Sequence, residues 1–392
     1  MILTVLSACT GGDPDAGSSL LAVLAGDDKL TTTRGQAIDS GLLIDGTKAQ
    51  GQGWAVAVAE GLLIVGLPEL DEVHVLDASD LGRVRIEDIT IGHLVGPRES
   101  RFGASISHGP RGLLVGGPDT DAGTTSPDAG AAWLFAELPV GEVAASSAEL
   151  ILHGEAAFDH LGEVVALCED TLGLAAPWQQ SGALLGGAVY LVEEETGELP
   201  VAAVGTRWAS ATEGAQLGRA LGCREGEVLA GAPFEDGDHE AVGAVFELPA
   251  SPGGSIEGAG TLSLFGLLGQ DYAGSSIATG DIDADGDIDV AIGAFGSDAT
   301  LLFDGSQLAI GSRSPQYLFP GGAVSIGDLN GDGHDDLVTH GDSVNVYRGG
   351  VGFNDWPRIQ EEPDASFEQA ASVVVGDIDL DGADDLLVLI ER

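Results

Sequence analysis

Short apolar runs separated by turn residues extend along almost the whole chain, and they recur without helical periodicity. Ala131–Phe135, Ala188–Val192 and Ala244–Leu248 are examples, because each combines β-branched or aromatic residues with small ones. Such runs are typical of half-buried strands. The 61 glycines among 392 residues supply the tight turns and close backbone approaches that many short strands need. The pattern therefore predicts an all-β fold.

The apolar runs are organised as repeats of one unit. Each copy begins with a small or aromatic residue and a glycine, passes through two strands to a Gly-Ala-Pro or similar segment, and adds a third strand. Copies begin near residues 53, 102, 161, 217, 273, 320 and 369, with a spacing of 47 to 59 residues. Four strands of five or six residues, with their turns, fill that length. We therefore expect seven repeats, each forming a four-stranded sheet.

Three copies carry the clearest motif. They are Phe102-Gly103 with Gly116-Gly117-Pro118, Leu161-Gly162 with Ala175-Ala176-Pro177, and Leu217-Gly218 with Gly231-Ala232-Pro233. This motif resembles the FG-GAP repeat of the integrin α-subunit propeller, and the resemblance extends over roughly residues 50–392. It implies a seven-bladed β-propeller with four-stranded blades that acts as an interaction or adhesion module.

The last repeat supplies only two strands, at residues 372–376 and 386–390, before the sequence ends. An exposed strand edge of this kind invites aggregation. Two further apolar runs, at residues 20–25 and 38–45, precede the first full repeat. We therefore predict that these runs are the third and fourth strands of the C-terminal blade. They would close one propeller domain over residues 20–392.

Three acidic segments follow the pattern D-x-[DN]-x-D-G-x-x-D. Oxygen ligands at positions 1, 3, 5 and 9, with the carbonyl at position 7, can surround a cation of calcium's size, and the glycine at position 6 makes the sharp turn. Strands flank each segment, so each is expected to connect the first and second strands of its blade, where integrin-type propellers hold calcium. The candidate ligands are Asp281, Asp283, Asp285, Asp287, Asp289, Asp328, Asn330, Asp332, His334, Asp336, Asp377, Asp379, Asp381, Ala383 and Asp385.

Calcium is the cation that suits this ligand set. An EF-hand is excluded, because position 12 is Ile292, Thr339 or Val388 where that motif has glutamate. Magnesium requires stricter octahedral geometry, and transition metals prefer imidazole or thiolate ligands. The alternative is an acidic turn that binds nothing. Three matches at equivalent repeat positions favour three structural calcium ions.

The charge and the N-terminus bear on partners and compartment. The chain has 63 acidic and 15 basic residues, a net charge of -48, which repels phosphate backbones, so no nucleic-acid partner is expected. The run Leu6-Ser7-Ala8-Cys9 resembles a bacterial lipobox, with residues 1–9 as signal and lipobox and residues 10–19 as a polar tether. This implies lipidation at Cys9 and a protein that is anchored in the bacterial cell envelope or secreted. A chance match is the alternative, because no basic residue precedes the short apolar run.

Cys168 and Cys223 follow Gly162 and Gly218 at nearly equal intervals, near the ends of the first strands of adjacent repeats. Export would permit a disulfide. Inner strands of neighbouring blades can nevertheless be too far apart, and a Cα separation above about 7 Å would exclude the bond. The sequence leaves both outcomes open.

No catalytic motif is found: H-E-x-x-H, G-x-S-x-G and the P-loop are absent, and the eight histidines show no metal-ligand spacing. We therefore expect a monomeric, non-enzymatic module that binds a protein or glycan. A polysaccharide hydrolase or lyase is one alternative, which a carboxylate pair about 5 to 9.5 Å apart in a deep pocket would favour. A calcium-dependent lectin is another, which an exposed aromatic platform would favour. The candidate platform residues are Trp54, Trp133, Trp178, Trp208 and Trp356, although packing in the core or within a blade is the more ordinary role for each of them.

Overall fold

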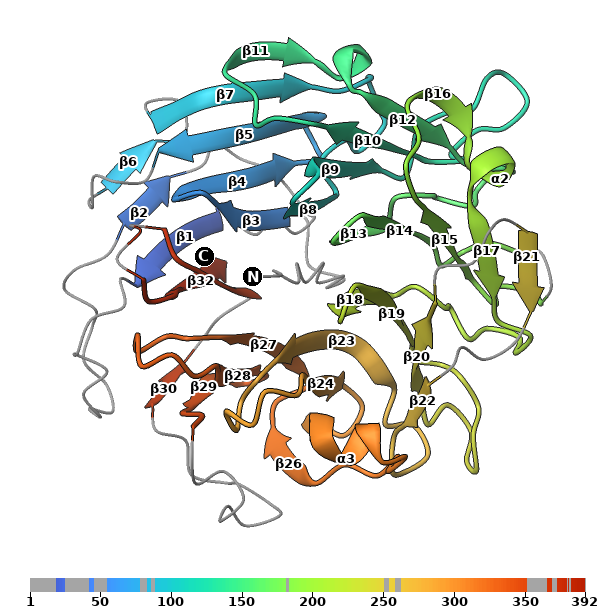
Figure 1. The fold of residues 1–392 in the computed structure, drawn as a ribbon. Coiled ribbons are helices and arrows are strands. Elements are labelled where there is room, and N and C mark those ends of the chain that lie inside the picture. Colours follow the sequence, from blue (N-terminus) through green and yellow to red (C-terminus); the bar gives the residue numbers. More distant parts are fainter. Residues whose placement is uncertain are drawn as a thin grey trace.

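The computed structural model describes residues 19–24, 42–45, 55–77, 83–85, 89–180, 183–249, 254–257, 262–350, 365–368, 372–378, 380 and 382–391. These residues form seven sheets that lie around a common centre (Figure 1). Helical segments in the same residues are short: η1 (Ala145–Ser147), α2 (Val201–Val204) and α3 (Gly305–Ala309). The all-β prediction is confirmed. Cys9 and most of the predicted tether lie outside the described residues.

Each sheet begins with an inner strand and continues outward through antiparallel neighbours. The strands of the first three sheets, from the inside outward, are β3 (Ala55–Ala59), β4 (Leu62–Leu67), β5 (Glu72–Asp77) and β7 (Thr90–Val95); β8 (Ser105–Gly109), β9 (Gly112–Gly117), β10 (Ala131–Phe135) and β12 (Leu150–His153); and β13 (Val164–Cys168), β14 (Thr171–Ala176), β15 (Ala188–Val192) and β17 (Thr206–Ala209). The apolar runs predicted as third strands coincide with β10, β15 and the corresponding strand of the fourth sheet.

The fourth to sixth sheets follow the same order. Their strands are β18 (Ala220–Arg224), β19 (Glu227–Ala232), β20 (Ala244–Leu248) and β22 (Leu262–Phe265); β23 (Ala273–Gly280), β24 (Asp289–Ala294), β25 (Ala299–Phe303) and β26 (Tyr317–Pro320); and β27 (Ala323–Gly327), β28 (Asp336–His340), β29 (Ser343–Tyr347) and β30 (Ala365–Glu368). The inner three strands of these sheets are almost entirely buried, because they pack between neighbouring sheets.

The seventh sheet combines strands from opposite ends of the chain. Its order is β31 (Ser372–Gly376), β32 (Asp385–Glu391), β1 (Ser19–Leu24) and β2 (Leu42–Asp45). β1 pairs antiparallel with β32 over six residues, with Leu20 opposite Ile390, and β2 pairs antiparallel with β1. These pairings give the strand order that the sequence predicts for residues 20–25 and 38–45.

Four of the sheets carry a fifth strand, which corrects the prediction of four strands for every sheet. The added strands are β6 (Arg83–Arg85), β11 (Gly141–Ala144), β16 (Gly197–Pro200) and β21 (Gly254–Glu257). Each comes from the connection between the third and fourth strands of one sheet and pairs in parallel with the outermost strand of the preceding sheet; β6 pairs with β2 of the seventh sheet. The additions cover outer edges that would otherwise present unpaired backbone groups.

The repeated glycines have a direct packing role between neighbouring sheets. A Cβ atom on Gly116, at the end of β9, would lie 2.0 Å from the carbonyl oxygen of Gly162, and one on Gly231 would lie 2.0 Å from that of Gly274. Gly162 and Gly274 themselves adopt φ angles of +87° and +91°, which favour glycine. The motif at the end of the second strand of one repeat therefore makes room for the glycine that begins the next repeat.

A disulfide joins two of these neighbouring sheets. Cys168 ends β13 and Cys223 lies next to the end of β18, and their Cα atoms are 5.3 Å apart. The separation is below the limit of about 7 Å for such a bond. Of the two outcomes that the sequence leaves open, the structure has the bonded one.

We expect loss of this disulfide to lower the free energy of unfolding. The bond closes a loop with a sequence separation of 55, which corresponds to about 4 kcal/mol in the loop-entropy model. Urea denaturation of Cys168→Ser/Cys223→Ser measures the change. The reduced natural chain serves as the control, because its midpoint should match that of the variant. Equal midpoints for the oxidised natural chain and the variant would contradict the expectation.

Candidate functional site

The three acidic segments, residues 281–289, 328–336 and 377–385, connect the inner and second strands of the fifth, sixth and seventh sheets. We call them the first, second and third acidic loops. Because successive strands of a sheet are antiparallel, the connections between third and fourth strands lie on the same face of the molecule as the acidic loops. We call this the acidic-loop face. The remaining connections lie on the opposite face. The loops thus occupy the position that the sequence predicts.

The first acidic loop is a tight turn with three carboxylates directed to one point. Ligand atoms of Asp281, Asp283 and Asp285 all lie within 4.8 Å of one another. The backbone N–H of Asp285 donates to Asp281 Oδ1 at 3.1 Å and to Asp283 Oδ1 at 3.2 Å, and that of Gly286 donates to Asp281 Oδ2 at 3.0 Å. Gly286 has a φ of +92°, so the sharp turn at position 6 requires its conformational freedom.

The last aspartate of the first loop, Asp289, is fully buried at the start of β24. It accepts hydrogen bonds from the backbone N–H of Ile282 at 3.0 Å and of Gly305 at 2.7 Å. Burial raises the pKa of Asp289 to about 8, and nearby carboxylates act in the same direction. Burial and neighbouring aspartates likewise raise the pKa of Asp283 to about 6. The loop therefore brings together carboxyl groups whose ionised forms disfavour one another, and a bound cation would stabilise those forms.

The second acidic loop repeats this network. The backbone N–H of Asp332 donates to Asp328 Oδ1 at 3.1 Å and to Asn330 Oδ1 at 3.0 Å, and that of Gly333 donates to Asp328 Oδ2 at 2.8 Å. Asp336 is fully buried, and burial raises its pKa to about 6. His334 lies at position 7, where only its backbone carbonyl was predicted as a ligand. Two loops thus have closely similar geometry.

The third acidic loop is described in part. The backbone N–H of Gly382 donates to Asp377 Oδ2 at 3.1 Å, the same bond that glycine makes in the other loops. Asp377 Oδ1 is buried and makes no hydrogen bond. Ala383 follows Gly382 at position 7. Asp379 and Asp381 lie outside the described residues, and Asp385 is the first residue of β32.

The acidic loops are joined to one another in series, which sequence reasoning missed. Asp335 Oδ2 of the second loop accepts from the backbone N–H of Asp281 at 2.9 Å, and Asp384 Oδ2 of the third loop accepts from that of Asp328 at 2.9 Å. A Cβ on Gly280 would lie 2.5 Å from Asp335 Oδ2. The sequence signal for these links was an aspartate at position 8 of the loop, which is present in the second and third loops and absent from the first. The first residue of one loop is thus fixed by the next loop.

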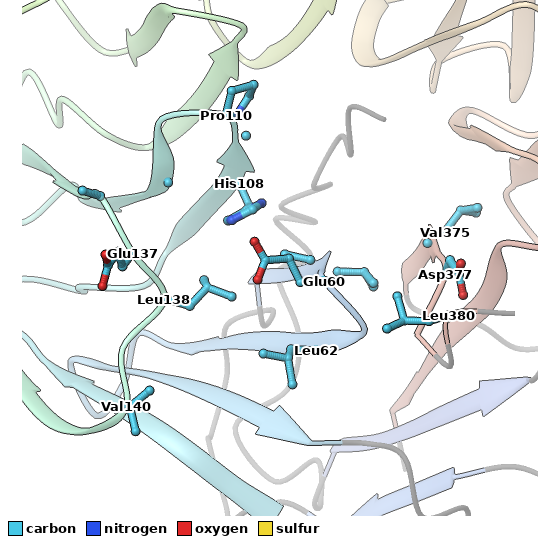
Figure 2. Close-up of a pocket in the computed structure, with 16 residues that line it drawn as sticks. Glu60, Leu62, His108, Pro110, Glu137, Leu138, Val140, Val375, Asp377 and Leu380 are labelled. Carbon is cyan, nitrogen blue, oxygen red and sulfur yellow. The ribbon is translucent and has the colours of Figure 1, made fainter. Parts of the chain in front are cut away.

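A pocket of about 800 Å³ opens on the acidic-loop face. Figure 2 shows Glu60 beside His108, with Glu137 and Asp377 on separate walls. Burial lowers the pKa of His108, and the charge of Glu60 opposes this effect. The four side chains come from the first, second and seventh sheets, so the pocket exists only where those sheets meet.

Among the described residues, the tryptophans considered for the lectin alternative do not form an exposed platform. Trp133 and Trp208 are buried in the core. Trp178 is half-buried and lies beneath the guanidinium of Arg219, 5.7 Å from the ring centroid. Trp54 and Trp356 lie outside the described residues.

Other aromatic side chains gather on the opposite face, between the fourth and fifth sheets. The rings of Tyr272 and Phe295 stack with centroids 4.7 Å apart, and Phe234 lies 5.2 Å from Tyr272. Phe295 is 52% exposed, and Leu268, in the same connection as Tyr272, is 65% exposed. The backbone N–H of Gly296 donates to Asp271, which holds the two connections together. We call Phe234, Leu268, Tyr272 and Phe295 the apolar patch.

Comparison with known proteins identifies one repeat. Residues 328–388, which contain the second and third acidic loops, match the model of the FG-GAP-like repeat. Among solved structures, the chain is similar to virginiamycin B lyase from Staphylococcus aureus, with 6% identity over 86% of this chain and 94% of that chain and a TM-score of 0.45. Hydrazine synthase from Kuenenia stuttgartiensis has 13% identity over 79% and 89%, with a TM-score of 0.44. No curated protein matches the chain.

In the described part of the chain, no helix has the length and apolar character to span a membrane.

Proposed function

We propose that this FG-GAP β-propeller is a calcium-stabilised interaction module of the bacterial cell envelope, or a secreted one, that binds a protein or glycan. The observation that carries the proposal is the apolar patch. Phe295 and Leu268 are 52% and 65% exposed in neighbouring connections, and apolar patches of more than a few hundred Å² on soluble proteins mark binding sites. The patch also lies away from the acidic loops, so the face that binds ligand and the face that binds calcium are separate.

The distribution of other exposed apolar side chains supports this choice of face. In the described connections of the opposite face, the exposed large apolar side chains, with the patch members Leu268 and Phe295 included, are Leu70, Phe158, Leu184, Leu267, Leu268 and Phe295. Val140, Ile310 and Leu380 are their counterparts on the acidic-loop face. Among the described residues, the opposite face therefore has more exposed large apolar side chains, which could serve as anchors for a partner.

The proposal includes a ring of seven blades that is closed by the N-terminal strands. Inner strands contact one another in the series β3, β8, β13, β18, β23, β27 and β31, and β31 contacts β3. The pairing of β1 with β32 and of β6 with β2 adds two further links between the ends of the chain. Both kinds of contact support closure.

Calcium binding at the three acidic loops is supported by the convergence of carboxylates in the first loop and by the same hydrogen-bond pattern in the second. The ions would be held by the oxygen ligands that the sequence identifies. They would stabilise the ionised forms of aspartates whose pKa values are raised by burial and by one another. Their role would be structural, since the loops lie within hairpins of the sheets.

Export is supported by the disulfide between Cys168 and Cys223, because such bonds persist in oxidising compartments. The lipobox-like run ending at Cys9 suggests a lipid anchor, followed by a tether at residues 10–19. The net charge of -48 would keep the anchored domain soluble and away from anionic lipid heads.

The test is binding of the calcium-loaded chain to arrays of glycans and of extracellular protein fragments. We expect Phe295→Ser with Leu268→Ser to weaken binding of an array ligand at least tenfold, because buried apolar anchors dominate binding energies. Ile310→Ser is the matched control, since Ile310 is 79% exposed on the acidic-loop face. Its binding should be unchanged.

Three outcomes would overturn the proposal. They are the absence of any array ligand, unaltered binding by the patch variant, and equal loss in Ile310→Ser. Release of new reducing ends from a bound glycan would favour the hydrolase or lyase alternative instead, with the pocket around Glu60 and Glu137 as its site.

A further inference from the structure

A cluster of two histidines and a glutamate lies in the first sheet, far in sequence from the acidic loops. Glu72 and His74 are two residues apart on β5, so their side chains project from the same face of the strand. His93 on β7 is the direct cross-strand partner of His74. The pairing of β5 with β7 therefore brings all three side chains together.

Two of the three separations between the ligand atoms are those expected around one small cation, and the shorter one also lies within hydrogen-bond distance. His74 Nε2 lies 3.1 Å and His93 Nε2 3.4 Å from Glu72 Oε2, and all three ligand atoms fall within 4.8 Å of one another. Zinc is bound by nitrogen and oxygen at about 2.0 to 2.2 Å, so neighbouring ligand atoms of a tetrahedral site are separated by about 3.3 Å. The two measured separations match edges of such a tetrahedron.

The surroundings hold the imidazoles in a coordinating arrangement. His74 Nδ1 is 3.1 Å from Thr90 Oγ1, the type of second contact that orients metal-bound histidines. The two rings stack, with centroids 4.5 Å apart. His93 Nε2 is buried and makes no hydrogen bond, although it lies near the glutamate. A buried nitrogen directed at a carboxylate without a hydrogen bond is explained by a shared ion between them.

We propose that Glu72, His74 and His93 bind a divalent transition-metal ion of the zinc class. Two imidazoles and one carboxylate suit zinc, copper or nickel, whereas calcium prefers oxygen ligands throughout. The three side chains leave one tetrahedral position for water or another ligand. The site would fasten the third strand of the first sheet to its fourth, and the chain would carry two chemically distinct kinds of metal site.

The test uses the full chain, from which metal ions are first removed with chelator. The chain is then returned to buffer with excess calcium, so that the acidic loops are occupied and do not compete for zinc. Calorimetric titration with zinc chloride should show one tight equivalent. Cobalt(II) in its place should give the visible absorption of tetrahedral coordination. We expect His93→Ala to weaken zinc binding at least tenfold, and Glu72→Gln to weaken it as well.

The matched control is His153→Ala. His153 Nε2 lies 2.9 Å from Glu198 Oε1 on the second sheet. Among the described residues, this pair belongs to neither of the side-chain clusters that could hold a metal ion. Its removal should leave zinc binding unchanged. Thermal unfolding in calcium alone verifies that each variant is folded, and His93→Gln replaces His93→Ala if the latter is not. Absence of a zinc equivalent, full binding by the folded His93 variant, or equal loss in His153→Ala would overturn the proposal.

Discussion

Removal of calcium should loosen the fifth, sixth and seventh sheets before the third and fourth. An ion bound only by the folded chain stabilises it by about 2.7 kcal/mol per site at a free concentration one hundred times Kd, or roughly 8 kcal/mol for three sites. Without the ions, the converging aspartates of residues 281–289 repel one another. Hydrogen exchange with and without chelator measures the effect sheet by sheet.

The third and fourth sheets are the internal control for calcium removal. Their inner hairpins turn at Glu169-Asp170 and Glu225-Gly226, two residues each, and carry no acidic loop. Equal amide protection in all sheets, in both conditions, would contradict the prediction. The serial links add a second measurement: Asp335→Ala should loosen residues 281–289 in the neighbouring loop, because Asp335 accepts from the N–H of Asp281. Asp342→Ala, which removes an exposed carboxylate of the same sheet, should not.

Deletion of residues 19–45 should destabilise the seventh sheet first. The deletion removes β1 and β2 and leaves the edge of β32 without a partner along residues 386–391. It also removes the partner of β6, so both strand pairings between the ends of the chain are lost and only the contact of β31 with β3 remains. We expect loss of amide protection in residues 372–391 and aggregation through the exposed strand edge.

A shorter deletion and an added peptide serve as controls for this experiment. Deletion of residues 1–18 alone should leave the seventh sheet protected, because no pairing of β1 is removed. A peptide of residues 19–45, added to the shorter chain, should restore protection by supplying the missing strands in trans. Full protection of residues 372–391 in the chain without residues 19–45 would show the prediction to be wrong.

The parts of the fold that sequence predicted are those encoded within one repeat. The strands Ala131–Phe135 and Ala188–Val192 carry their own alternation and turn residues, so their bounds could be read directly. The pattern of the acidic loops likewise fixes their place between two strands. The order of the seventh sheet is the exception, because it joins two distant segments; it was predicted from an unpaired edge and two spare apolar runs.

The features that sequence did not predict depend on contacts between repeats. The fifth strands, such as β11 and β16, have no marked alternation and form because a neighbouring edge is available. The disulfide depended on the distance between adjacent inner strands, which no pattern states. The cluster of Glu72, His74 and His93 had a local signal in the alternation of Glu72 and His74, but its third member depends on the register of two strands. The position-8 aspartates, Asp335 and Asp384, act only across loops.

The fifth strands and the shared seventh sheet also determine when each part of a newly made chain can be completed. The outermost strands of the first, second and third sheets pair with β11, β16 and β21, and each of these strands is synthesised only with the following repeat. β1 leaves the ribosome first, but its partner β32 follows about 360 residues later. At about 5 to 20 residues per second, that delay is roughly 20 to 70 s. During this interval β1 can pair with β2 on one side only, so its other apolar edge must be kept from pairing with other chains until β32 is made.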